Sequence, residues 1–70
     1  MARSADPERI YIARRTGHVM RLTRLARLGP AAAERWVAKW EAEAALRGLD
    51  RHAAAFWEPA WEWISWRRGG

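Results

Sequence analysis

The sequence predicts an all-α fold, a small three-helix bundle with a tryptophan-rich core. Helix-forming residues dominate, β-branched residues are few, and no stretch alternates apolar and polar residues over the length of a strand. Glycine and proline separate three segments of helical length. We expect residues 1–70 to form a single domain, with flexible tails at residues 1–5 and 69–70.

The first helix is expected over about residues 7–28. Asp6 is placed to cap its free N–H groups, Pro7 suits its first turn, and Gly29 is expected to end it. Gly17 lies inside this span, where glycine costs about 1 kcal/mol relative to alanine. The apolar spacing continues across this glycine without a phase shift, which favours one continuous helix. The expected apolar stripe consists of Tyr11, Ile12, Val19, Leu22, Leu25 and Ala26.

The second and third helices are expected over about residues 30–47 and 51–67. Gly48 follows the second helix, where a left-handed glycine commonly ends a helix, and Asp50 is placed to cap the third. Pro59 falls inside the third segment and removes one backbone hydrogen bond. It therefore either bends the third helix or restarts it after a short first piece.

Aromatic residues supply most of the expected core. Each buried aromatic side chain removes roughly 150–250 Å² from water, which matters for a chain of this size without cysteine. Trp63 lies at the edge of the apolar face of the third helix, and Trp66 falls among polar residues, so both are candidates for an aromatic interface. The expected core residues are Leu22, Leu25, Trp36, Trp40, Trp57, Trp61 and Ile64.

The charge of the chain is concentrated in its first helix. The formal net charge is +5, and the segment from Arg9 to Arg27 holds six arginines and no acidic residue. A run of one sign either meets an anionic partner or is a solvated face whose arginines pair with glutamates of the neighbouring helices. The candidate residues for contact with a partner or with phosphate are Arg9, Arg14, Arg21, Arg24 and Arg27.

Residues that carry catalysis or bind metals are scarce. There is no cysteine, and the chain has only two serines, which lie near its ends. His18 and His52 each lack a second ligand at metal-site spacing, and Glu58 and Glu62 are neighbours on a face that we expect to be solvated. We therefore expect no enzymatic activity, no catalytic residue, no metal site and no cofactor.

These patterns predict a small cytoplasmic binding protein. No apolar run approaches the roughly 18 residues that a membrane span needs, and the N-terminus lacks the apolar region of a secretory signal. The expected partner is an acidic protein surface or a second copy of the chain in a homodimer, contacted through the arginines and the exposed aromatics. Phosphate-directed binding of nucleic acid is the alternative. A membrane-active peptide is disfavoured by eight acidic residues and by helix caps suited to a globular fold.

Overall fold

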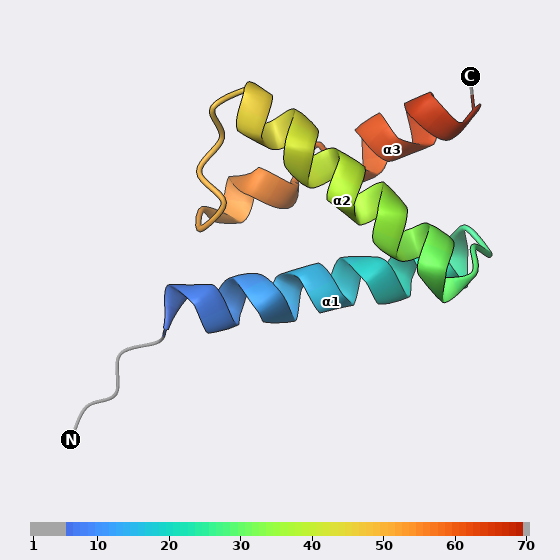
Figure 1. The fold of residues 1–70 in the computed structure, drawn as a ribbon, viewed down its shortest axis with the longest axis horizontal. Coiled ribbons are helices and arrows are strands. Elements are labelled where there is room, and N and C mark those ends of the chain that lie inside the picture. Colours follow the sequence, from blue (N-terminus) through green and yellow to red (C-terminus); the bar gives the residue numbers. More distant parts are fainter. Residues whose placement is uncertain (1–5, 70) are drawn as a thin grey trace.

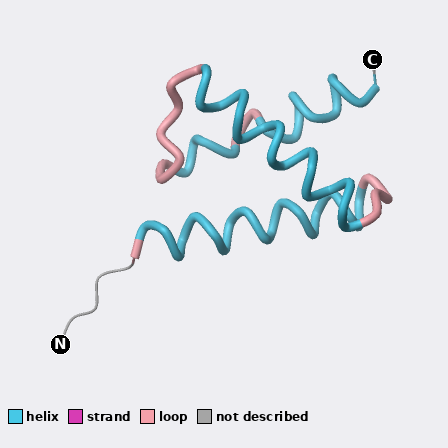
Figure 2. The backbone as a smooth tube through the Cα atoms, viewed as in Figure 1, coloured by secondary structure: helices cyan, strands magenta, loops and turns pink. Residues whose placement is uncertain are grey.

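The structure is a computed structural model that describes residues 6–69 of the chain. It contains three α-helices and one short 3-10 helix, connected by turns (Figure 1). Within the described residues there is no strand (Figure 2), which confirms the predicted all-α three-helix fold. The elements are α1 (Pro7–Leu25), α2 (Pro30–Leu46), η1 (Ala54–Trp57) and α3 (Ala60–Gly69).

The start of α1 follows from its local sequence. The Asp6 side chain accepts a hydrogen bond of 3.0 Å from the backbone N–H of Glu8, and Pro7 occupies the first turn, where its missing N–H is not needed. The helix runs through Gly17 without a break, as the spacing of its apolar residues predicts. The predicted tail at residues 1–5 lies outside the described residues, and so does residue 70.

The end of α1 differs from the expectation. The helix ends at Leu25, and Arg27 takes a left-handed backbone conformation with φ 57°. The N–H of Leu28 then donates to the carbonyl of Leu22 at 3.5 Å, so the chain has turned before it reaches Gly29. The predicted boundary near residue 28 is therefore too late. Gly29 instead precedes α2 in an extended conformation, as its N-cap.

The end of α2 agrees with the expectation. Gly48 has φ 73°, in the left-handed region that favours glycine. Its N–H donates to the carbonyl of Ala45, and the N–H of Leu49 donates to the carbonyl of Ala44, both at 3.0 Å. This pair of bonds is the Schellman arrangement, which satisfies carbonyls that the helix end would otherwise leave without a donor.

The third predicted helix is divided into two pieces. Asp50 caps a turn, because its carboxylate accepts from the N–H of His52 at 2.9 Å, and the 3-10 helix η1 follows. Pro59 immediately precedes α3, where a residue without an N–H is tolerated, and its carbonyl accepts from Trp63 at 2.9 Å. A single helix over 51–67 is wrong, and the alternative of a restart at the proline is correct. Gly69, expected in the tail, ends α3.

The core lies where α2 packs against both α1 and α3 (Figure 1). Of the expected core residues, Trp36 and Trp61 are only partly buried against it. The buried residues of α1 are Tyr11 and Leu22, which lie three turns apart on the same side of the helix. Leu25 lies beside this line and is 66% exposed. Ile12 lies off the same line and is also exposed. The expected core residues that are buried are Leu22, Trp40, Trp57 and Ile64.

The aromatic rings of η1 connect the first two helices. The ring of Phe56 lies 5.8 Å from that of Tyr11 on α1 and 6.1 Å from that of Trp40 on α2, both edge to face. Trp57 lies 5.7 Å from Tyr11 and stacks on His18 at 4.5 Å. Such pairs contribute roughly 0.5–1.5 kcal/mol beyond the area that they bury. The short 3-10 segment therefore packs against both α1 and α2.

Candidate interaction surfaces

The predicted contact arginines do not all share one surface. Arg14, Arg21 and Arg24 lie on one side of α1, since seven and three residues separate them along the helix. We call these three residues the arginine face. Arg9 lies five residues before Arg14, so the helical repeat rotates it away from this face. Arg27 lies beyond the end of α1, in its left-handed turn.

The arginine face makes no ion pair with any residue in the range 6–69. Its neighbour Arg15 pairs with both Glu34 and Glu41, and the distance from its Nε to the Glu41 carboxylate is 3.0 Å. The remaining ion pairs of the described residues involve Glu8, Glu43 and Asp50, with residues outside α1 as partners. Among the six arginines from Arg9 to Arg27, Arg15 is therefore the one that pairs with glutamates of a neighbouring helix within the described part of the chain.

One member of the arginine face contacts a tryptophan. The guanidinium carbon of Arg21 lies 4.8 Å from the centre of the Trp61 ring, a cation–π contact between α1 and α3. Arg21 has no anionic partner among residues 6–69. The arginine face is thus held in place on one side by α3, and its charge is not neutralised within the described chain.

Apolar side chains lie among these arginines. Met20 is 46% exposed and Leu25 is 66% exposed, and both line a shallow hollow of about 440 Å³ with Arg21 and Arg24. Gly17 lines the same hollow. The sequence interpretation missed this feature because it assigned Leu25 to the core. The sequence held no signal for it, because the line of buried residues through Tyr11 and Leu22 depends on how α2 packs against α1.

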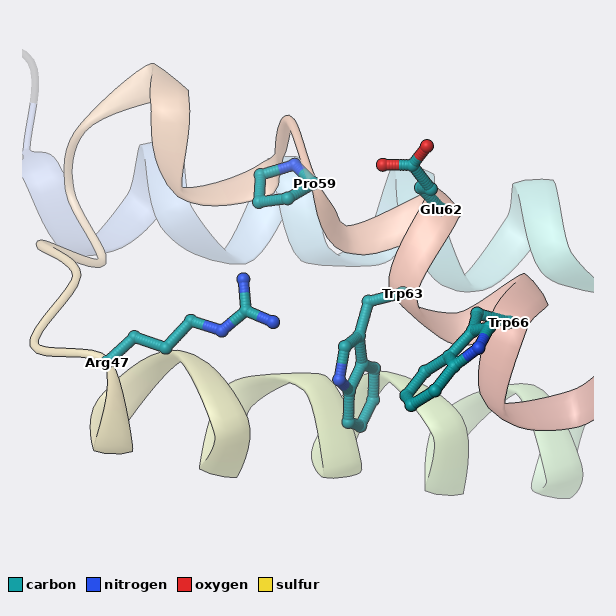
Figure 3. A pocket seen from close by; sticks show the side chains of 5 residues that line it. All are labelled: Arg47, Pro59, Glu62, Trp63 and Trp66. Atoms are coloured by element: carbon teal, nitrogen blue, oxygen red, sulfur yellow. The ribbon is translucent and has the colours of Figure 1, made fainter.

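The two candidate interface tryptophans, Trp63 and Trp66, form a second surface, which we call the aromatic surface. Trp63 and Trp66 line a hollow of about 330 Å³ together with Arg47, Pro59 and Glu62. Figure 3 shows both indole rings lying between α3 and α2, with the Arg47 side chain extending toward them from the end of α2. Trp66 is 66% exposed, as its place among polar residues predicts.

Trp63 is fixed more firmly than Trp66. It is half-buried, with its ring 5.6 Å from that of the buried Trp40 and the guanidinium of Arg67 5.5 Å from its centre. The Nε of Arg47 is engaged by Glu43 at 2.9 Å. The aromatic surface therefore has one anchored ring and one exposed ring.

The arginine face and the aromatic surface are separate. Arg21 touches Trp61, and Trp61 lies five residues before Trp66 on α3, on another side of that helix. Trp63 faces α2 rather than α1. The structure therefore places the two sets of candidate residues on two distinct surfaces.

A buried polar group joins α1 to α2. The Tyr11 hydroxyl donates to Glu41, which also accepts from Arg15. Burial, and then the hydrogen bond and the negative charge of Glu41, raise the pKa of Tyr11 well above its ordinary value. The hydrogen bond to Glu41 likewise raises the pKa of Arg15. Tyr11 therefore remains protonated, which suits a structural donor rather than a base.

His18 is the third titratable group with a displaced pKa. It stacks on Trp57 and is half-buried, and burial followed by the positive charge of Arg21 lowers its pKa below the ordinary value of 6.5. His52 lies elsewhere, 3.3 Å from the Glu8 carboxylate. Within residues 6–69 no three histidine, cysteine or acidic side chains gather as metal ligands.

Comparisons with protein-family models, curated proteins and solved structures gave no match. None of the described helices combines the length and the apolar character that crossing a bilayer requires.

Proposed function

We propose that this protein is a non-enzymatic binding protein, an adaptor or regulator that contacts an acidic protein surface through the arginine face of α1. One observation carries the proposal. The three guanidinium groups have no acidic partner within the described chain, and exposed Met20 and Leu25 lie among them. Apolar side chains surrounded by charge are typical of interaction sites.

The apolar side chains favour protein over nucleic acid. A phosphate backbone supplies anionic oxygens for the arginines but offers nothing apolar to cover Leu25 and Met20. An acidic protein segment with its own apolar side chains supplies both kinds of contact. We accordingly prefer a protein partner, and a cytoplasmic location suits a binding protein without cysteine.

Nucleic acid is the second candidate. The observation in its favour is again that Arg14, Arg21 and Arg24 make no ion pair within residues 6–69, because guanidinium groups bind phosphate as readily as carboxylate. The two candidates differ in whether the apolar residues of the hollow contribute to binding.

The test compares two leucines that are both exposed. Leu25→Ser changes the hollow, and Leu46→Ser changes a side chain that is 85% exposed on α2. The probe is a synthetic helical peptide with glutamate and leucine at amphipathic spacing, titrated while its fluorescence anisotropy is recorded. We expect Leu25→Ser to weaken binding about tenfold, the size of one lost apolar contact, and Leu46→Ser to leave it unchanged.

The matched charge variants are Arg24→Gln and Arg35→Gln, which remove one positive charge each from exposed positions on α1 and α2. The proposal predicts weaker peptide binding for Arg24→Gln alone. Equal losses for both variants would indicate attraction to net charge rather than to the arginine face. Tight binding of duplex DNA, with an affinity that Leu25→Ser leaves unchanged, would favour the nucleic-acid candidate.

A further inference from the structure

Gly17 lies on the arginine face at a position where the fold does not require glycine. It sits inside the continuous helix α1, and a Cβ atom added there would meet nothing within 4 Å. Alanine at an exposed helix position is more favourable than glycine by about 1 kcal/mol. What the missing side chain does provide is space, because Gly17 lines the hollow beside Met20, Leu25 and the arginines.

The helix α3 of the same chain carries side chains that complement this hollow. Trp66 is 66% exposed, and Glu62 precedes it by four residues, one turn earlier on the same helix. Glu58 precedes Glu62 by another four residues, in helical backbone conformation. Neither glutamate makes an ion pair within residues 6–69. The other described acidic residues are engaged in caps or ion pairs: Asp6, Glu8, Glu34, Glu41, Glu43 and Asp50.

The aromatic surface cannot contact the arginine face of the same molecule. Arg21 of the arginine face contacts Trp61, and five residues separate Trp61 from Trp66, so the exposed indole lies on another side of α3. The nearby Arg47 is neutralised by Glu43 at 2.9 Å, which leaves Glu62 as the charged group of the aromatic surface without an ion-pair partner in the described chain.

We infer that the acidic partner of the arginine face is a second copy of this chain. Trp66 of one copy enters the hollow at Gly17 of the other, and Glu62 and Glu58 meet the guanidinium groups of Arg21 and Arg24. This inference rests on the proposed function, since it names the partner of the same surface. The contact joins two different surfaces, so it either closes into a dimer with two equal contacts or continues from copy to copy.

The first test uses Gly17→Ala in the full chain. A methyl group at this position stabilises the helix and raises Tm, yet it occupies part of the space that receives Trp66. Sedimentation velocity over a concentration series should then show self-association weakened about tenfold. The control is Thr16→Ala, which also improves helix propensity at an exposed position but lies outside the hollow. Unchanged self-association in Gly17→Ala would overturn the inference.

The second test reverses charges on each surface separately. Arg24→Glu and Glu62→Arg should each weaken self-association, because each places like charges in the contact. An equal mixture of the two variants should associate again, since each contact between the two different copies then joins opposite charges. A mixture that stays monomeric would contradict the contact.

The remaining outcomes separate this inference from the proposed function. If the protein is monomeric at every concentration while Leu25→Ser still weakens binding of the glutamate–leucine peptide, the second copy is excluded and the proposed function stands. A second outcome is self-association that is unchanged by Gly17→Ala and Arg24→Glu but lost in Trp66→Ser. The contact would then be a direct pairing of two aromatic surfaces, and this inference would fail.

Discussion

Tyr11 connects three elements of the molecule through one side chain. Its ring packs against Phe56 and Trp57 of η1, and its hydroxyl donates to Glu41 of α2, which Arg15 also contacts. A hydrogen bond to a charged group contributes more to stability than a neutral one. The sequence placed Tyr11 on the apolar stripe of the first helix but gave no sign of its partner, which lies 30 residues away.

Replacing Tyr11 by phenylalanine tests this bond. Tyr11→Phe should lower the free energy of unfolding by about 1.5–3 kcal/mol, because it removes a donor to a partly buried carboxylate. Urea denaturation followed by tryptophan fluorescence measures the change. The same substitution made in a Glu41→Gln background should have a smaller effect, and equal effects in both backgrounds would show that the two groups are not coupled.

His18 should make stability depend on pH. Its folded-state pKa lies below the ordinary value of 6.5, so the unfolded chain binds a proton first as the pH falls. The stabilisation is therefore complete above pH 6.5 and is lost as the pH falls through the folded-state pKa. Tm measured from about pH 7.5 to about pH 5 should fall less for His18→Gln than for the unaltered protein. An identical fall in both proteins would contradict this account.

At the scale of the elements, helix ends divide into those that the local sequence determines and those that it does not. Asp6, Pro7 and Gly48 act through their own backbone and side chains, and their roles were predictable. The end of α1 was not predictable from the local sequence, because the left-handed residue is Arg27, a residue type that seldom takes this conformation. The chain accepts that conformation where Leu28 turns back to pack against the core.

The two left-handed residues should respond to substitution in opposite directions. Gly48→Ala should lower the free energy of unfolding by about 1 kcal/mol, because a Cβ atom is strained at φ 73°. Arg27→Gly should raise it by up to about 1 kcal/mol, since glycine adopts φ 57° without that strain. Chemical denaturation of both variants measures the two changes. A loss of stability in Arg27→Gly would mean that the arginine side chain makes a stabilising contact.

At the scale of the whole molecule, the candidate surfaces were only partly predictable. The run of arginines was visible because charge needs no tertiary information, and Trp66 was visible because it falls among polar residues. The hollow beside the arginine face was not visible in the sequence, because the line of buried residues on α1 depends on how α2 packs against this helix. Leu25 therefore appeared to belong to the core, and its exposure among Arg21 and Arg24 emerged only from the structure.

The proposed function requires that the arginine face bind an acidic protein surface with apolar side chains of its own. The most direct measurement is the affinity for the glutamate–leucine peptide and for duplex DNA of equal charge, each over a series of salt concentrations. We expect tighter binding of the peptide, with an affinity that decreases only weakly with salt because apolar contacts are not screened. Tighter binding of DNA, with log affinity falling steeply and linearly with log salt, would contradict it.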